Sequence, residues 1–211
     1  MVELKDIRTL QEEFETLPAS NNESCIAFYE LNKDSIDNID INAGKNEYNT
    51  KLRLDCEYGL SLSGVKKKEQ AAKVLSYAIP MYEKAPSDKQ SELTKSSYYE
   101  TLLWNYAHSL YEIGALSEST KQFRRLVKIH PHDDKYSSWL NTLKSQRIIF
   151  VTRYSWWGLM VWTVCSWTIF DFFSDVVSLS LSIIGGAVML ITGLLELYNY
   201  QLKKRITYSE S

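Results

Sequence analysis

Two long uncharged runs near the end of the chain most constrain what this sequence can fold into. Residues 156–173 carry no charge before Asp171, and a second run, 176–195, is uncharged throughout. The hydrocarbon core of a bilayer is about 30 Å thick and takes about 20 helical residues, so both runs are long enough to cross it. The pair predicts a transmembrane hairpin with spans at about 155–173 and 176–198. The alternative is two helices buried in the core of a soluble protein.

The flanks of the two runs favour the membrane interpretation. Arg147 and Arg153 precede the first run and the basic segment 203–205 follows the second, whereas the link at 171–175 contains no basic residue. Basic residues concentrate on the cytoplasmic side of membrane proteins. The sequence therefore predicts an integral membrane protein with both termini cytoplasmic and the acidic link on the far side.

Small residues recur on one face of the second run, a pattern that lets helices approach closely in lipid. They are Ser178, Ser182, Gly186 and Gly193. We expect them to pack within the hairpin, with an interface between copies of the chain, or a pore, as the alternatives. An ion pathway has no support, because the spans carry no ionisable group near their middle.

The rest of the chain predicts an all-α fold, since glycine is scarce and no run alternates between apolar and polar residues as a strand would. Helices are expected at about 3–16, 22–33, 48–63, 67–84, 96–113, 117–130 and 134–150. The expected domains are acidic N-terminal helices with a connection (1–47), a helical domain (48–150), the hairpin (151–200) and a basic tail (201–211).

Two segments of the helical domain have related spacings of small and apolar residues. In the later segment these are Leu103, Tyr106, Ala107, Leu110, Gly114, Leu116, Ser119, Phe123, Leu126 and Pro131. In the earlier one they are Tyr58, Gly59, Leu62, Ala71, Leu75 and Ala78. Both resemble the tetratricopeptide repeat (TPR), in which small residues let two antiparallel helices touch. The resemblance implies TPR-like helical hairpin repeats, and an unrelated helical bundle is the alternative.

TPR-like repeats commonly bind an extended or helical peptide in a groove lined by the first helix of each repeat. By register, seven residues are expected in this groove: Arg53, Glu57, Leu60, Trp104, Asn105, His108 and Tyr111. Two alternatives remain. Trp104 and Leu60 could simply pack beneath the N-terminal helices, or an N-terminal segment of the same chain could fill the groove.

The sequence contains none of the common phosphate-binding, metalloprotease or hydrolase motifs, so we expect neither an enzyme nor a cofactor. Three cysteines without a paired spacing indicate neither a disulfide framework nor a zinc site. The segment HPHDD at 130–134 is read as a helix-capping turn rather than a metal site. A formal net charge of −2 argues against a nucleic-acid partner, since such proteins carry a basic surface.

These features together predict a membrane-anchored TPR-like adaptor that binds a protein partner on the cytosolic side and concentrates it at the membrane. The layout is similar to that of the mitochondrial fission 1 protein, on the segments EYGLSLS (57–63), the intervening 87–120 and KKR (203–205), although that layout has a single span.

The second hypothesis is an effector of the antiviral-defence type. In it, the helical domain would sense a nucleotide or protein ligand and drive oligomerisation and membrane disruption. A third hypothesis makes the chain one subunit of a larger membrane complex.

Overall fold

The computed structural model describes residues 5–18, 21–85, 96–169, 183 and 185–200. All the regular structure in these residues is helical, as the sequence predicts. The chain divides into two units, residues 1–131 and 132–211, and each is described by itself.

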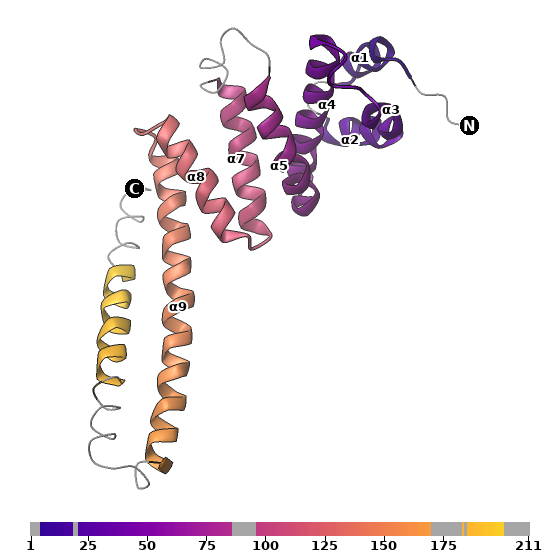
Figure 1. The fold of residues 1–211 in the computed structure, drawn as a ribbon. Coiled ribbons are helices and arrows are strands. Elements are labelled where there is room, and N and C mark those ends of the chain that lie inside the picture. Colours follow the sequence, from indigo (N-terminus) through magenta and orange to yellow (C-terminus); the bar gives the residue numbers. More distant parts are fainter. Residues whose placement is uncertain (1–4, 19–20, 86–95, 170–182, 184, 201–211) are drawn as a thin grey trace. The chain divides into compact units, whose positions relative to one another are not determined.

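Seven helices of the first unit are described, and one long helix begins the second (Figure 1). The helices of the first unit are α1 (Ile7–Glu15), α2 (Asn22–Leu31), α3 (Lys33–Asp37), α4 (Lys45–Gly64), α5 (Lys68–Lys84), α7 (Ser97–Glu112) and α8 (Leu116–Ile129). In the second unit, α9 spans Asp134–Ile169, and residues 185–200 are also helical. The short α3 lies in the polar connection before α4, where the sequence predicted no helix.

Repeated helix-to-helix packing organises the first unit. Helix α4 packs against α5 and α7 packs against α8, while α5 also packs against α7 and α4 contacts α7. We call α4 with α5 the first helix pair and α7 with α8 the second helix pair. The predicted fold of successive helical hairpins is therefore confirmed at the level of repeated helix pairs.

Small residues allow the helices of each pair to approach closely. A Cβ atom built on Gly59 of α4 would lie 2.7 Å from Leu75 Cδ2 of α5, closer than two carbon atoms can pack. In the second helix pair, the buried Ser119 of α8 donates a hydrogen bond from its hydroxyl to the backbone oxygen of Ala107 on α7, at 2.8 Å. The spacing of small residues in the sequence thus marks real points of contact.

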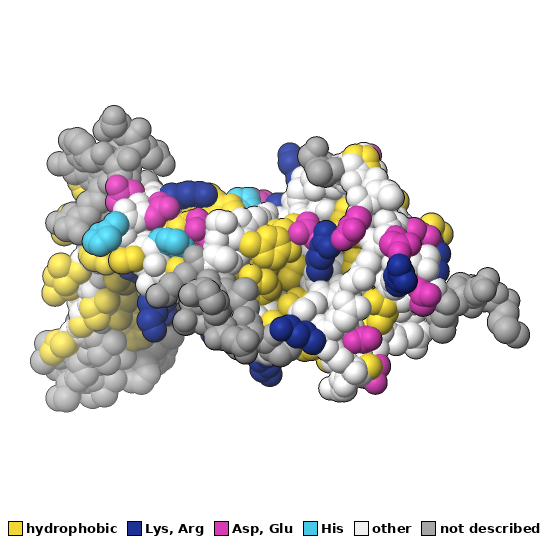
Figure 2. All heavy atoms as spheres, turned by 90° about the horizontal axis from the view of Figure 1, so that it is seen from above, with side chains coloured by type: hydrophobic (Ala, Val, Ile, Leu, Met, Phe, Trp, Pro, Cys, Tyr) yellow, Lys and Arg dark blue, Asp and Glu magenta, His cyan; other side chains and the backbone are white. Residues whose placement is uncertain are grey.

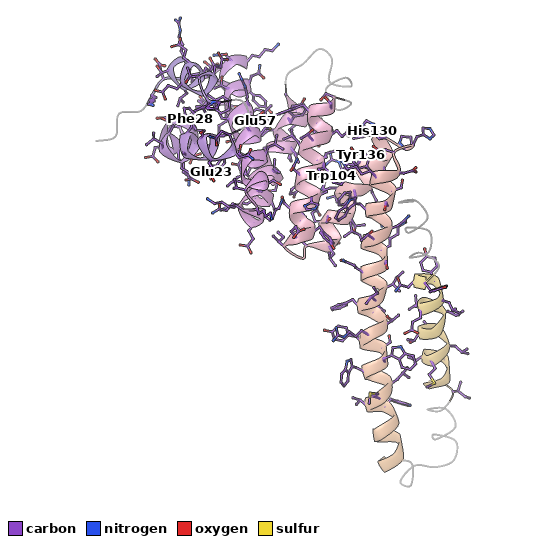
Figure 3. All side chains as sticks on the ribbon, turned by 180° about the vertical axis from the view of Figure 1, so that it is seen from behind. Glu23, Phe28, Glu57, Trp104, His130 and Tyr136 are labelled. Carbon is purple, nitrogen blue, oxygen red and sulfur yellow. The ribbon has the colours of Figure 1, made fainter. Side chains whose placement is uncertain are left out.

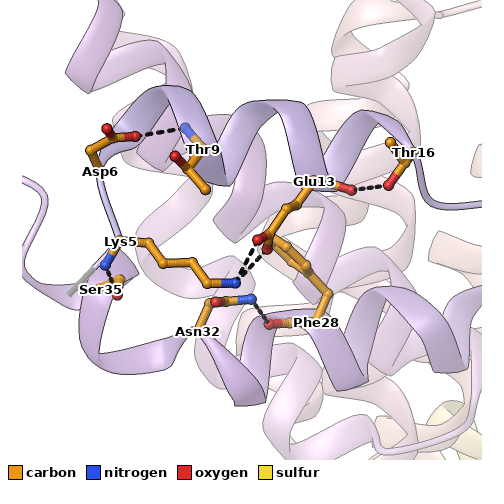
Figure 4. A network of polar contacts seen from close by, with 8 residues as sticks. All are labelled: Lys5, Asp6, Thr9, Glu13, Thr16, Phe28, Asn32 and Ser35. Atoms are coloured by element: carbon orange, nitrogen blue, oxygen red, sulfur yellow. Dashed lines mark hydrogen bonds and ion pairs between the residues drawn. The ribbon is translucent and has the colours of Figure 1, made fainter. Parts of the chain in front are cut away.

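The N-terminal helices share a core with the first helix pair. The buried members of this core are Leu10, Ile26, Phe28, Tyr29, Ile36, Leu54, Tyr58, Leu62, Ala71 and Val74. Polar contacts fasten the outer helices (Figure 4): Asp6 Oδ1 caps α1 by accepting from Thr9 N at 2.7 Å, and Lys5 N donates to Ser35 Oγ at 2.9 Å. The start of α1 is therefore tied to α3, far along the chain.

The predicted membrane hairpin is not supported. Within the described residues, no helix is both long enough and apolar enough to cross a bilayer. The apolar residues from 156 to 169 do not form a helix of their own but continue α9, which begins at Asp134 and carries Arg153. The prediction of an integral membrane protein with both termini cytoplasmic was therefore wrong. Residues 170–182 and 184, within or next to the predicted spans, lie outside the described residues.

The second unit joins α9 to the helical residues 185–200 by side-chain contacts. Trp156 Nε1 donates to Glu196 Oε1 at 2.7 Å, and the Ser145 hydroxyl donates to Asn199 Oδ1 at 2.6 Å. A shallow cavity of about 290 Å³ lies between these segments. It is lined by Lys144, Ile148, Val151, Leu195 and Tyr198.

The glycines predicted to pack in the hairpin are not the ones that lie close to a neighbour. A Cβ atom at Gly186 or Gly193 would meet no described atom within 4 Å, whereas one at Gly185 would lie 3.1 Å from Trp162 Nε1. Ser178 and Ser182, the other two residues of that prediction, lie outside the described residues.

Candidate partner-binding cavity

A cavity of about 430 Å³ lies beside the middle and second half of α4, and we call it the α4 cavity. Its lining comes from the end of α1 and the residues after it, from the start of α2, and from one face of α4. The lining residues are Phe14, Glu15, Leu17, Pro18, Asn21, Asn22, Cys25, Arg53, Glu57 and Ser61. Two of the seven predicted groove residues, Arg53 and Glu57, are among them.

Local sequence signals place the N-terminal wall of this cavity. Helix α1 ends at Glu15, and Pro18 follows shortly afterwards, as is common beyond a helix C-terminus. Helix α2 then begins with Asn21 as its N-cap, whose side-chain oxygen accepts a hydrogen bond from Ser24 N at 3.1 Å. The two ends hold Phe14 and Cys25 on the wall that faces α4.

Arg53 closes one side of the α4 cavity. Its Nη1 atom lies 3.2 Å from Glu15 Oε1, and its Cζ atom lies 5.5 Å from the centre of the Phe14 ring. Both charged side chains of this ion pair are more than half exposed, so the pair adds little stability. Its main consequence is electrostatic: the positive charge of Arg53 is balanced by the negative charge of Glu15.

Glu57 connects the α4 cavity to the second helix pair. Its Oε1 atom accepts a hydrogen bond from the Tyr98 hydroxyl on α7 at 2.9 Å. Burial is the main cause that raises the pKa of Tyr98, so this phenol stays a neutral donor. Burial also raises the pKa of Cys25, with a smaller contribution from Glu57, so the thiol in the cavity is protonated and weakly nucleophilic.

None of the four predicted groove residues on α7 lines the α4 cavity. Glu57 lies on α4 and Trp104 on α7, at separate places in the first unit (Figure 3). Trp104 packs edge-on against Phe123 of α8, with ring centres 5.5 Å apart. The alternative that Trp104 is a packing residue is therefore supported, although it packs on α8 rather than beneath the N-terminal helices.

The other predicted residues of α7 are Asn105, His108 and Tyr111, and each has a polar side-chain group. Asn105 Oδ1 accepts from the Ser63 hydroxyl of α4 at 3.0 Å. His108 lies between Trp104 and Tyr111, with ring centres 6.2 and 6.3 Å away. Burial, followed by the nearby charge of Lys68, lowers the pKa of His108. The remaining predicted residue, Leu60, is half-buried on α4.

Sequence reasoning missed the N-terminal half of the α4 cavity. Phe14, Leu17, Pro18, Asn21, Asn22 and Cys25 were not predicted to belong to the site. The helix stop at Leu17–Pro18 and the capping asparagines were visible signals of a turn, but nothing in the sequence indicated which helix that turn would face.

The histidine-rich turn behaves as a structural element. His130 Nε2 lies 3.0 Å from Glu100 Oε2 of α7. Asp133 Oδ1 accepts a hydrogen bond from Lys135 N at 2.9 Å at the start of α9, which confirms the predicted capping role. Among the described residues, no group of three His, Cys, Asp or Glu side chains is placed to hold a metal ion.

Comparisons with protein-family models, with curated proteins and with solved structures find no match to this chain. The resemblances to TPR repeats and to the fission 1 layout therefore stay predictions made from the residues.

Proposed function

We propose that this protein is a TPR-like helical adaptor that binds a peptide segment of a protein partner in the α4 cavity. The observation that carries the proposal is the cavity itself, which lies on the first helix of the first helix pair and contains the predicted residues Arg53 and Glu57. In TPR-like stacks, the first helix of each repeat is the one that lines the binding groove.

The size and lining of the α4 cavity support a binding role. A volume of about 430 Å³ falls within the range of typical ligand pockets, which combine apolar walls with a few polar groups. Phe14, Leu17 and Pro18 supply the apolar wall, and Asn22 and Ser61 are polar groups that can bond a peptide backbone. No catalytic step is assigned to these residues; the adaptor acts by contact.

The two helix pairs support the proposal through rigidity. The second helix pair braces α4 through the contacts of Glu57 with Tyr98 and of Ser63 with Asn105. A binding surface held by packed helices loses little conformational entropy when its partner binds, which favours affinity.

The proposal is tested by selecting peptides from a random library on the full-length protein and measuring their affinity by fluorescence polarisation. Asn22→Trp places a large side chain in the α4 cavity, and we expect it to weaken binding roughly tenfold or more. Ala27→Trp is the matched control, because Ala27 is exposed on the same helix and does not line the cavity. Equal affinities for both variants, with both folded by circular dichroism, or failure to select any peptide, would overturn the proposal.

A further inference from the structure

The charges of the α4 cavity are unequal. Its ionisable lining consists of two carboxylates, Glu15 and Glu57, one guanidinium, Arg53, and the protonated thiol of Cys25. Glu15 and Arg53 balance each other at 3.2 Å. The lining thus carries a net charge of −1, and among the residues that the structure describes no cation forms an ion pair with Glu57.

Glu57 has a neutral hydrogen-bond partner rather than a cationic one. Among the residues that the structure describes, the Tyr98 hydroxyl is the group that donates to this carboxylate. A partly buried carboxylate gains most from a charged donor, because ionic hydrogen bonds are roughly twice as strong as neutral ones. A cation brought by a ligand would supply the missing charge.

The acidic N-terminal region around the α4 cavity also favours a cationic ligand. Residues 1–57 contain 13 acidic and 6 basic side chains. Figure 2 shows Asp and Glu side chains gathered over the N-terminal helices on the face in view. This field attracts positively charged segments and repels anionic ones. An anionic ligand is further disfavoured because Arg53 is already paired with Glu15.

The apolar wall suits the stem of a basic side chain. Phe14, Leu17 and Pro18 line the cavity together with the carboxylate of Glu57. Lysine and arginine side chains pack their methylene groups along apolar surface while the charged end reaches a polar group. The wall and the carboxylate thus match the two parts of one such side chain.

We propose that the α4 cavity takes a lysine or arginine side chain of the partner peptide, with its stem against Phe14 and Leu17 and its cationic end on Glu57. This inference rests on the proposed function and names the chemical class of the partner, a basic peptide segment. Glu57 is the residue that determines this specificity.

The test uses peptides selected from a random library on the full-length protein. We expect one position of the selected peptides to be enriched in Lys or Arg. Replacing that residue by norleucine, which keeps the aliphatic stem and removes the charge, is expected to weaken binding to the native protein roughly tenfold. On a Glu57→Gln variant, whose amide oxygen can still accept from Tyr98, the same replacement is expected to change binding less than about twofold.

Glu23→Gln is the matched control. Glu23 is an exposed carboxylate in the first turn of α2 and does not line the α4 cavity. It removes the same charge from the same acidic region, so we expect the norleucine penalty to stay as large as in the native protein. An equal loss of the penalty in both variants would indicate a general field effect and overturn the assignment to Glu57.

A second measurement locates the bound side chain. Cys25 lines the cavity and is partly exposed, whereas Cys56 is fully buried. Alkylation of Cys25 by N-ethylmaleimide is measured by peptide mapping. We expect the selected basic peptide to slow this alkylation, and the norleucine peptide at the same concentration to slow it less. Unchanged alkylation at saturating basic peptide would overturn the placement.

Different results would overturn the adaptor proposal and the preference for a basic side chain. Selected peptides that bind with no basic preference, but are blocked by Asn22→Trp, would overturn this inference and leave the adaptor proposal intact. Failure to select any peptide would overturn both.

Discussion

The first and second helix pairs share one register and differ in the residues that fill it. Equivalent positions lie 48 residues apart in the sequence, so that Gly59 corresponds to Ala107 and Lys66 to Gly114. Both pairs turn through a residue with positive φ, 64° at Lys66 and 78° at Gly114. The turn of the second helix pair therefore has a glycine, which adopts positive φ without strain, whereas the turn of the first helix pair has a lysine, which is strained there.

The difference is clearest at the buried position of each first helix. Leu103 of α7 is fully buried, and its equivalent on α4 is Asp55, which is also fully buried. Asp55 Oδ1 accepts from the Tyr29 hydroxyl at 2.6 Å and lies 3.3 Å from Lys51 Nζ. The first helix pair thus buries a carboxyl group that takes a hydrogen bond from α2, where the second helix pair buries a leucine.

The largest effect is expected at the equivalent core residues Leu75 and Phe123, both fully buried. We expect Phe123→Ala to lower the free energy of unfolding by about 3–5 kcal/mol, because it leaves a cavity and removes the edge contact with Trp104. Leu75→Ala should cost about 2–5 kcal/mol. Urea denaturation measures both. A loss below 1 kcal/mol at Phe123 would contradict the view that the second helix pair is a packed unit.

The closest helix contact gives the next effect. Gly59→Ala should destabilise the protein by about 1–3 kcal/mol, since the added methyl group meets Leu75 Cγ at 2.9 Å and overpacks the core. The helix propensity of alanine offsets part of this cost. Combining Gly59→Ala with Leu75→Ala should give a loss smaller than the sum of the single losses in denaturation. Simple additivity would show that the two residues do not touch.

The buried carboxyl of Asp55 predicts a pH dependence that has no counterpart at the equivalent Leu103 of the second helix pair. Burial raises the pKa of Asp55, while Tyr29 and Lys51 oppose this shift and Asp37 adds to it. The folded state therefore holds the proton at higher pH than the unfolded chain, so this contribution is full below the usual carboxyl pKa and is lost as pH rises through the folded value.

The measurement compares the native protein with Asp55→Asn between pH 7 and pH 4. The free energy of unfolding of the native protein should rise relative to that of the variant as the pH falls. A pKa shift of one unit corresponds to about 1.4 kcal/mol. A difference that does not change with pH, or that changes with the opposite sign, would show that Asp55 ionises freely in the fold.

The smallest effect is expected at the turns. A residue with a side chain in the left-handed region costs about 1–2 kcal/mol relative to glycine. Lys66→Gly should therefore stabilise the protein by about 1 kcal/mol, and Gly114→Ala should destabilise it by about the same amount. Thermal melts of both variants measure the pair. If both substitutions stabilised the protein, or both destabilised it, the two turns would not be equivalent.

Local signals made much of the fold predictable. Helix positions followed from apolar periodicity, and the helix pairs from small residues at recurring spacings, because these patterns act over one or two turns of a helix. The same spacing placed Arg53 and Glu57 on one face of α4, where both line the α4 cavity. Trp104 shared the predicted face but packs on Phe123, since an apolar ring can bury itself on either neighbour.

The two long uncharged runs misled the prediction, because the extent of a helix is not visible within an apolar run. Their length suggested separate spans, yet α9 is continuous from Asp134 to Ile169, and no described helix meets the length and apolarity that a bilayer requires. A run of apolar residues gives no sign of where its helix begins, because a polar segment can propagate the same backbone hydrogen bonds.

The sequence by itself determined that this protein is helical, where most of its helices lie and which small residues bring them together. Only the tertiary structure decided that Leu17 and Pro18 line a cavity on α4, that Tyr29 donates a hydrogen bond to the buried Asp55, and that Glu57 faces the cavity with a neutral partner. The physical reason is the distance along the chain over which each effect acts. Backbone propensity acts between near neighbours in the chain, whereas cavities and charge balance depend on residues brought together from distant segments.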